Sequence, residues 1–319
     1  MIPLAERYRD RLPIEAGTPV VTLGEGSTPL LPAPRLSERL GLDVRLKWEG
    51  ANPTGSFKDR GMTVAISQAA AAGARAVVCA STGNTAASAA AYGARAGLGV
   101  EILLPQSAVA LGKIAQARAA GARLVQVRGP FEQALAGALE LQKRGTHVLV
   151  NSLNPDRIEG QKTAAFEVVE ELGSPPAALA LPYGGGGNTR AYARGFDEWG
   201  SGLPRLVAGA AADRVATFAS AIRIADPAHR AEAERAIERS GGAVVPLTDE
   251  ELREWWRRIV QEEGVFCEPA SAAGVAALPR AGLEPGSTVV CVLTGHGLKD
   301  PDAAASLAAE PDAFAAAAA

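Results

Sequence analysis

Lys58 is the side chain in this sequence with the clearest chemical possibilities. It stands in the segment NPTGSFKDRG, residues 52–61. Thr54 and Gly55 favour a turn, and Ser56 is a suitable N-cap for a helix that begins just after it. A cation is disfavoured at the positive end of a helix, so the pKa of Lys58 should fall. A lysine that gives up its proton readily can attack an aldehyde and form a Schiff base, although a solvated lysine on a helix start is the commoner case.

A second chemical feature is the segment PYGGGGN, which follows an apolar, strand-like run. Backbone amides without side chains can approach an anion closely, and a helix capped by Asn188 would add its positive end. The segment lacks the Lys-Ser/Thr pair of a P-loop and does not match GxGxxG, so it does not indicate a nucleotide site. A close-packing turn is the alternative to a phosphate cradle. The cradle predicted here consists of Gly184, Gly185, Gly186, Gly187 and Asn188.

Two further polar segments follow strand-like runs, at residues 81–85 and 294–297. The first, STGNT, carries hydroxyls, an amide side chain and backbone amides that can hold an anion or a ring oxygen. In the second, TGHG, the hydroxyl of Thr294 can bond the nitrogen of a heterocycle. Taken alone, each segment is equally compatible with an ordinary helix cap or turn.

A third polar segment, NSLNPDR at residues 151–157, offers donors for an oxyanion from Asn151, Ser152 and Arg157. Arg157 can form a pair of hydrogen bonds with a phosphate or a carboxylate, and capping of the next helix is the alternative use of the loop. One ligand, pyridoxal phosphate, accounts for all of these segments. It needs a lysine for its aldehyde, a cradle for its phosphate, a donor for its ring oxygen and a partner for its ring nitrogen.

These segments need a scaffold that brings several strand ends together. From residue 44 onward, short apolar runs alternate with longer Ala-rich helical patterns. This alternation predicts an α/β protein with mostly parallel sheets and helices on both faces. Ligands in such sheets bind at the carboxyl ends of the strands. Residues 24–36 are rich in Gly and Pro and are expected to be mostly extended or turned. Residues 211–245 are expected to form a helix-bearing surface excursion of unknown role.

Composition narrows the class of protein further. The chain has 319 residues, of which 47% are hydrophobic and 21% charged, with a formal net charge of -3. It has no basic excess for nucleic acid or an anionic membrane, and no apolar run long enough to cross a bilayer. The 3 cysteines and 3 histidines do not cluster, so no metal site is expected. A cytoplasmic enzyme is the expectation, because the N-terminus shows no signal-peptide pattern.

Several long motifs resemble those of one family. NPTGSFKDRG, STGNT, NSLNP-R-EGQKTAAFE, EGVF-EPASAA and LTGHGLKDPD are together similar to threonine synthases, in the tryptophan-synthase-β-like (fold type II) group of pyridoxal phosphate enzymes. The resemblance runs from about residue 20 to 303. It implies two three-layer αβα domains with the cofactor in the cleft between them. It also implies a homodimer.

The resemblance implies roles position by position. Lys58 would bond the cofactor aldehyde and later move protons, and Asn84 would bond the ring 3-hydroxyl. Phe57 would pack on the ring, Thr294 would face the ring nitrogen, and Gly184 to Asn188 would hold the cofactor phosphate. The implied substrate contacts are Asn151, Ser152, Arg157 and Asn188 for a substrate phosphate, and Ser81, Thr82 and Thr85 for the substrate carboxylate.

The implied substrate is O-phospho-L-homoserine. Lys58 would remove the α and then a β proton, phosphate would leave from the γ carbon, and water would add at the β carbon to give threonine. A hydroxyl at the ring nitrogen, in place of a carboxylate, does not force that nitrogen to be protonated. Two departures from the family pattern bear on the substrate: Gly185 stands where an Asn is usual, and the segment between Gly209 and Ala219 is short.

Two other functions stay open from the sequence. A related enzyme, such as a threonine or serine dehydratase or a β-replacement synthase, would not need Arg157 for a substrate phosphate. A non-catalytic pyridoxal phosphate-binding protein is the third possibility, and the intact Lys58 and Thr294 disfavour it. For the domains, we expect a large one from residues 1–53 plus 156–319 and a small, mobile one from 54–155.

Overall fold

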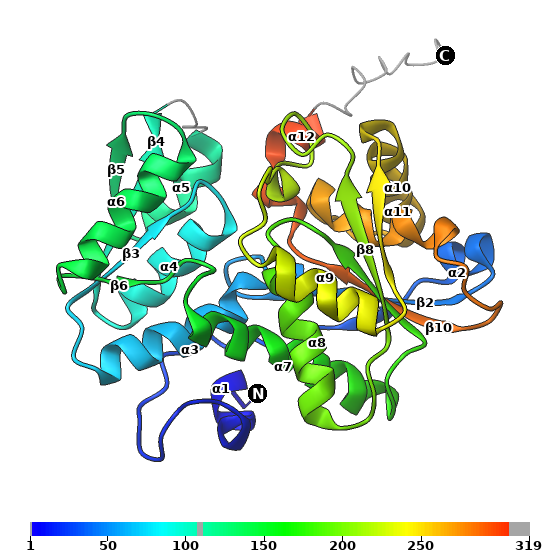
Figure 1. Ribbon diagram of the computed structural model, residues 1–319, viewed down its shortest axis with the longest axis horizontal. Coiled ribbons are helices and arrows are strands. Elements are labelled where there is room, and N and C mark those ends of the chain that lie inside the picture. The colour runs from blue at the N-terminus through cyan, green and yellow to red at the C-terminus, as the bar shows by residue number, and fades with distance from the viewer. Residues whose placement is uncertain (1, 107–110, 306–319) are drawn as a thin grey trace, which may run out of the picture.

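The computed structural model describes residues 2–106 and 111–305, and its strands form two separate sheets (Figure 1). The larger sheet has the order β1-β2-β10-β7-β8-β9, and only β1 is antiparallel to its neighbour. Its central strands are almost wholly buried, as expected for parallel strands covered on both faces. The strands are β1 (Leu30–Pro32), β2 (Asp43–Trp48), β7 (Ala178–Pro182), β8 (Arg205–Ala211), β9 (Ala243–Leu247) and β10 (Thr288–Leu293).

The smaller sheet is entirely parallel and has the order β5-β4-β3-β6. Its apolar core lies on both faces, so this part of the chain is also three layers deep. The alternation of apolar runs and Ala-rich helices therefore predicted the architecture correctly. The strands are β3 (Ala76–Ala80), β4 (Gly99–Pro105), β5 (Arg123–Val127) and β6 (Val148–Leu149).

Helices cover both faces of each sheet. On the larger sheet, one face packs against α2 (Pro34–Leu40), α10 (Asp249–Glu263) and α11 (Ala272–Ala277), and the other against α7 (Pro155–Leu172), α8 (Gly187–Trp199) and α9 (Arg230–Arg239). On the smaller sheet, α3 (Lys58–Ala71), α4 (Asn84–Arg95) and α5 (Leu111–Ala119) cover one face and α6 (Phe131–Lys143) covers the other. Two short helices, α1 (Leu4–Arg7) and α12 (Pro301–Ala305), complete the described chain.

Helix α7 joins the two layered units, because it packs against α3 on one side and α8 on the other (Figure 1). The apolar face of α3 contributes to the core of the smaller sheet, which agrees with a small domain that starts near residue 54. The domain boundaries themselves stay a prediction. Every helix among the described residues is too short or too polar to span a lipid bilayer.

The N-terminal lead-in is more regular than its Gly and Pro content suggested. Residues 24–33 are extended or turned, as predicted for most of this segment, but its last three residues begin α2, which starts at Pro34 and buries Leu36 in the core of the larger sheet. Proline suits the first position of a helix because its φ is already helical and its missing N–H is not needed there. Gly41, in the left-handed conformation, ends the helix.

Candidate functional site

The lysine turn and the TGHG loop lie side by side at the carboxyl ends of β2 and β10, two neighbouring parallel strands. Ser56 forms an isolated antiparallel bridge with Gly295, and the backbone amide of Phe57 donates to the carbonyl of Thr294 at 3.0 Å. These contacts place the first turn of α3, with Lys58, directly beside Thr294. The structure therefore brings together two of the segments that the sequence singled out.

The prediction that Ser56 caps this helix is wrong. Helix α3 begins at Lys58 with Phe57 at the N-cap position, without a side-chain capping bond. The Ser56 backbone is held by the bridge to Gly295, which is a long-range contact that no local pattern reveals. Instead, the carboxylate of Asp59 accepts hydrogen bonds from the amide and the hydroxyl of Thr54, at 2.7 and 2.6 Å.

The electrostatic surroundings of Lys58 favour its neutral form. Burial and, to a smaller extent, the positive charge of Arg157 lower the pKa of Lys58 to about 7, and the carboxylate of Glu268 opposes the shift. The Lys58 ammonium lies 4.4 Å from the centroid of the Phe57 ring. The predicted direction of the shift is confirmed, and its main causes are burial and Arg157, an arginine far away in the sequence. At neutral pH this amine is available as a nucleophile and a base.

Arg157 reaches Lys58 because helices α3 and α7 approach each other very closely. A methyl group on Gly160 would lie 1.9 Å from the carbonyl oxygen of Arg60, and one on Gly61 would lie 2.8 Å from Nε of Arg157. Only glycine fits at both crossing points. The crossing sets the first turn of α7, which carries Arg157, against the first turn of α3.

The guanidinium of Arg157 is only partly satisfied by the protein. Its side chain is wholly buried, and one nitrogen, Nη1, donates to the carbonyl of Val150 at 2.8 Å. Its Nε and Nη2 have no hydrogen-bond partner among the described residues. Burial lowers the pKa of Arg157 to about 10, so the group is charged at neutral pH. A buried, charged fork with free donors indicates a site for a phosphate or a carboxylate.

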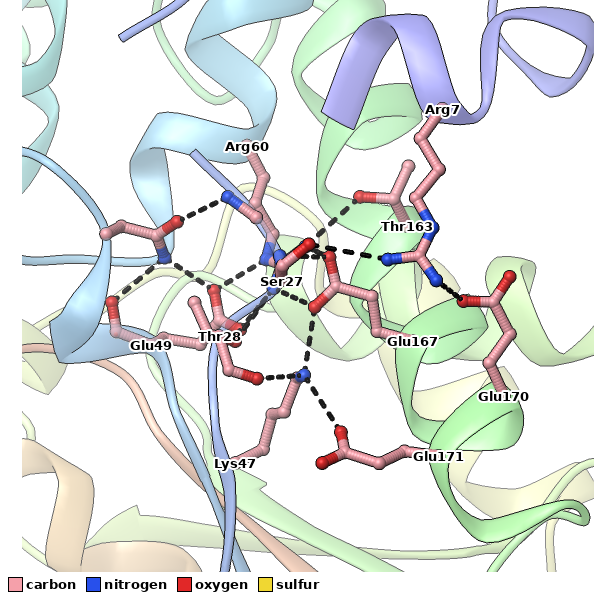
Figure 2. Close-up of polar contacts among 12 residues, drawn as sticks. Arg7, Ser27, Thr28, Lys47, Glu49, Arg60, Thr163, Glu167, Glu170 and Glu171 are labelled. Atoms are coloured by element: carbon pink, nitrogen blue, oxygen red, sulfur yellow. Dashed lines mark hydrogen bonds and ion pairs between the residues drawn. The ribbon is translucent and has the colours of Figure 1, made fainter. Parts of the chain in front are cut away.

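A buried network of ion pairs surrounds Arg60, which belongs to the lysine segment of residues 52–61 (Figure 2). Arg60 donates to both oxygens of Glu49, at 2.7 and 2.8 Å, and to both oxygens of Glu167, at 2.7 and 2.6 Å. Lys47 pairs with Glu167 at 2.9 Å, which balances two cations against two carboxylates. Glu49 also accepts from Asn52, the first residue of the lysine segment. The network therefore ties β2, α3 and α7 together through Arg60, two residues after Lys58.

The glycine cradle begins a helix two residues earlier than a cap at Asn188 would place it. Helix α8 starts at Gly187, and Gly186 occupies the N-cap position with φ +80°, so the prediction that Asn188 is the N-cap is wrong. A left-handed residue is needed there, which only glycine adopts without strain. The side-chain nitrogen of Asn188 is buried and has no partner among the described residues. Free amides at this helix start and the free Asn188 nitrogen suit an anion.

His229 was not singled out by the sequence analysis, yet it supports the cradle. Its backbone amide donates to the carbonyl of Gly185 at 3.0 Å, and its ring nitrogen Nε2 lies 2.8 Å from the carbonyl of Ser152. The excursion over residues 211–245, whose role the sequence left open, thus folds back over the glycine loop. A lone histidine carries no spacing signal, so only the tertiary structure reveals it.

Asn84 and Thr294 meet on one carboxylate, that of Glu268. The Asn84 nitrogen donates to Oε2 at 2.9 Å, and the Thr294 hydroxyl donates to Oε1 at 2.7 Å. Asn84 begins α4, after a strand of the smaller sheet, and Thr294 follows β10 of the larger sheet. Glu268 stands in the EPASAA motif but received no role from the sequence.

The remaining predicted site residues lie on the same side of the two sheets. Asn151 is buried, and its amide exchanges two hydrogen bonds with the backbone of Ala80, at 2.8 and 2.9 Å, so much of its capacity serves the fold. Ser81 accepts a hydrogen bond from the amide of Gly83. Ser81, Thr82 and Thr85 are half-buried around the start of α4. Their roles toward a substrate stay predictions.

The residues present fit pyridoxal phosphate. Lys58 offers an amine whose pKa is lowered to about 7. The cradle offers the unpaired side-chain nitrogen of Asn188, two residues after Gly186, where a methyl group would lie 2.9 Å from the carbonyl oxygen of His229. The orphaned donors of Arg157 form a second anion position near the same lysine. The cradle and the free donors of Arg157 can therefore hold two separate anions.

Comparison with known families and curated proteins gives a consistent picture. The family model described as "Pyridoxal-phosphate dependent enzyme" matches residues 21–295. A threonine synthase from Synechocystis sp. is 51% identical over 321 residues, which cover 94% of this chain and 84% of the relative. A threonine synthase from Halalkalibacterium halodurans is 47% identical, over 95% of this chain and 91% of the relative.

Solved structures share the fold at lower identity. A cysteine synthase from Entamoeba histolytica superimposes with a TM-score of 0.76 at 21% identity, covering 86% of each chain. A serine racemase from Dictyostelium discoideum gives a TM-score of 0.75 at 20% identity, covering 85% of this chain and 92% of the other. The predicted fold, two αβα units of the fold type II class, is confirmed.

Proposed function

The chain belongs to the family of pyridoxal-phosphate dependent enzymes, and we propose that it is a threonine synthase, which converts O-phospho-L-homoserine and water to L-threonine and phosphate. The proposal follows the curated relatives, which are 43–51% identical over most of the chain. Among the structural observations, Arg157 carries the most weight. A buried guanidinium with two free donors beside the reactive lysine suits a phosphate on the substrate better than a hydroxyl.

When bound, pyridoxal phosphate supplies the electron sink for a carbanion on the amino acid. The residues of this chain do the rest. Lys58, with a pKa of about 7, can take a proton from the α carbon and later move protons at the β and γ carbons. Arg157 and Asn188 orient the substrate phosphate so that it can leave from the γ carbon, and their charge and donors stabilise it as it departs.

The cradle from Gly184 to Asn188 holds the cofactor phosphate in this proposal. His229 fixes the loop by its bond to Gly185, so the missing side chain at that position does not leave the loop unsupported. Ser81, Thr82 and Thr85 would bind the substrate carboxylate at the start of α4. Asn151 and Ser152 would complete the substrate phosphate site next to Arg157.

The proposal is tested by incubating the cofactor-loaded protein with O-phospho-L-homoserine and measuring phosphate and threonine together. We expect both products in equal amounts, and neither from Lys58→Ala. A second variant, Arg157→Met, keeps the volume but removes the fork. It should raise KM for the phosphorylated substrate strongly while the absorbance of bound cofactor is unchanged. If the loaded protein releases ammonia from serine or threonine but no phosphate from O-phospho-L-homoserine, the enzyme is a dehydratase and the proposal fails.

We further propose a cytoplasmic homodimer whose small domain, residues 54–155, closes over the substrate. The support is the separate core of the smaller sheet and the few elements, α3 and α7, that connect it to the rest. Closure would exclude water until the addition step. Domain closure can be measured by small-angle scattering with and without a substrate analogue. Identical radii of gyration in the two samples would count against a mobile domain.

A further inference from the structure

His229 bridges two loops that the proposed function assigns to two different phosphates. It stands at the N-cap position of α9, which packs against α8 on the larger sheet (Figure 1). Its backbone amide donates to the carbonyl of Gly185 in the cradle at 3.0 Å, and its ring nitrogen Nε2 lies 2.8 Å from the carbonyl of Ser152. Only 5% of His229 is exposed, so solvent competes little for either bond.

The carbonyl of Ser152 belongs to the loop that leads from the smaller sheet into α7. This loop follows β6 and ends where α7 begins, at Pro155. Two of its bonds are local, because Arg157 donates to the carbonyl of Val150 at 2.8 Å and Asn154 donates to that of Leu149 at 2.9 Å. The bond from His229 comes from 77 residues further along the chain, in the excursion that covers the cradle. The position of the loop relative to the cradle therefore depends on this long-range contact.

Arg190 selects the ring nitrogen of His229 that carries the hydrogen. Nη1 of Arg190, on α8, lies 3.2 Å from Nδ1 of His229 and 3.4 Å from a carboxylate oxygen of Glu232. A guanidinium can only donate, and Nη1 has two hydrogens, so it can serve both acceptors. Nδ1 is then the acceptor, and Nε2 carries the hydrogen of the neutral ring. A carbonyl oxygen accepts, so the same tautomer donates to Ser152, and both ring bonds form together in this tautomer alone.

The ring and the backbone of His229 also lie against the start of α8. A methyl group on Gly187 would lie 3.2 Å from Cδ2 of the His229 ring, and one on Gly186 would lie 2.9 Å from the His229 carbonyl oxygen. The free side-chain nitrogen of Asn188 follows directly in the sequence. One residue thus contacts both the cofactor cradle and the loop that carries Ser152.

We propose that His229 determines specificity for a phosphorylated substrate by holding the Ser152 loop at a fixed position relative to the cofactor cradle. This inference rests on the proposed function, which puts the cofactor phosphate in the cradle and the substrate phosphate beside Ser152 and Arg157. A substrate that reacts at the cofactor with one end and carries a phosphate at the other needs both positions at a set separation. His229 is therefore a positioning residue that acts through the Ser152 backbone. Its two contacts can be tested separately, because the cradle bond comes from its backbone and the Ser152 bond from its ring.

The test is His229→Phe in the cofactor-loaded protein, because phenylalanine keeps a ring and the backbone amide but cannot donate to Ser152. We expect KM for O-phospho-L-homoserine and the inhibition constant of inorganic phosphate to rise roughly tenfold, as for an unmade buried hydrogen bond. The dissociation constant of pyridoxal phosphate should stay unchanged, and kcat should change less than KM. His229→Gln can donate with its amide nitrogen and accept with its oxygen, so it should restore most of KM. An unchanged KM in His229→Phe, or a parallel loss of cofactor affinity, would overturn the inference.

Histidine NMR gives a readout that does not depend on activity. With ¹⁵N-labelled histidine at mildly alkaline pH, we expect His229 to carry its hydrogen on Nε2, and Arg190→Met to lose this preference. A hydrogen on Nδ1 in the unmodified protein would overturn the inference.

The control is His147→Phe, since His147 contacts Thr146 and Glu101 and precedes β6, whereas Ser152 follows that strand. It should leave KM unchanged, and a rise equal to that of His229→Phe would count against a specific role for His229. A loaded protein that forms no phosphate and threonine from O-phospho-L-homoserine refutes the proposed function itself. An active enzyme whose KM does not respond to His229→Phe refutes only this inference.

Discussion

Replacing Arg60 with methionine should destabilise this protein more than most single changes. Arg60 donates to all four carboxylate oxygens of Glu49 and Glu167, and all three side chains are at most 4% exposed. Without the arginine, two buried carboxylates share one cation, Lys47. Removing one partner of a buried ion pair typically costs about 3–5 kcal/mol, because the other charge stays buried without compensation. That is a large part of the ~5–15 kcal/mol by which domains are stable.

The pH dependence provides a sharper test than the size of the loss. Burial alone would raise the pKa of Glu167, but the charges and hydrogen bonds of Arg60 and Lys47 hold it well below its usual range. In the unmodified protein this group therefore stabilises the fold above its unfolded pKa, about 4.3, and the contribution is lost as the pH falls. In Arg60→Met an uncompensated carboxylate has a raised pKa, so its penalty is full at pH 7 and is relieved by protonation. The difference in stability between the two proteins should shrink from pH 7 to pH 5.

Urea unfolding followed by circular dichroism, at pH 7, 6 and 5, measures this difference. The matched control is Arg39→Met, because Arg39 pairs with Glu262 at 2.7 Å on the surface, where it is 42% exposed. An exposed pair contributes about 0–1 kcal/mol, so the free energy of unfolding of the control should change little at any of these pH values. A loss in Arg60→Met below about 1 kcal/mol, or a loss that does not depend on pH, would refute the reasoning.

Three other predictions concern the site. In the cofactor-free protein, the rate at which Lys58 captures an aldehyde, followed by stopped-flow absorbance, should rise with pH around a midpoint near 7. Arg157→Met removes a positive charge, so it should move that midpoint to higher pH. An unchanged midpoint would exclude Arg157 as a cause of the lowered pKa. Gly186→Ala should weaken cofactor binding, measured by equilibrium dialysis, because its methyl group would lie 2.9 Å from a carbonyl oxygen. The control is Gly200→Ala, at the other end of the same helix, where φ is +83° and the space is open. It should lower stability by about 1–2 kcal/mol and leave cofactor binding unchanged. Gly160→Ala should force α3 and α7 apart. We expect urea unfolding to show a loss of stability of about 1–3 kcal/mol, and KM for a phosphorylated substrate to rise. An unchanged KM would show that the helix crossing does not position the anion site.

The sequence predicted the scaffold well because the scaffold is encoded locally. Parallel strands that are buried on both faces must be continuous apolar runs. Four of these runs, β2, β3, β7 and β10, end in a polar, glycine-bearing segment. The apolar run that begins at residue 75 forms β3 (Ala76–Ala80), and the Ala-rich segment that follows STG forms α4 (Asn84–Arg95). These polar, glycine-bearing segments also indicated the strand ends that carry Lys58 and Thr294.

Capping was predicted less well, because a cap depends on where the backbone goes. Ser56 and Asn188 are both residue types that cap helices readily, and neither does so here. The backbone of Ser56 is held by Gly295, more than two hundred residues further along the chain. At α8 the left-handed Gly186 takes the cap position, which leaves the Asn188 side chain free toward an anion. In both cases a long-range or ligand requirement overrides the local preference.

The chemistry of Lys58 illustrates why site residues can be found in a sequence while their properties cannot be derived there. The lysine was recognisable from its neighbours, but its lowered pKa comes from burial and from Arg157, which local sequence does not place nearby. That placement depends on Gly61 and Gly160, where a single added methyl group would separate the two helices. Glu268 behaves similarly, since its meaning appears only when Asn84 of one sheet and Thr294 of the other both donate to it. A residue that acts by connecting two segments has no signature in either segment. The reactive lysine can therefore be recognised in the sequence, whereas the groups that change its pKa are recognised only in the folded structure.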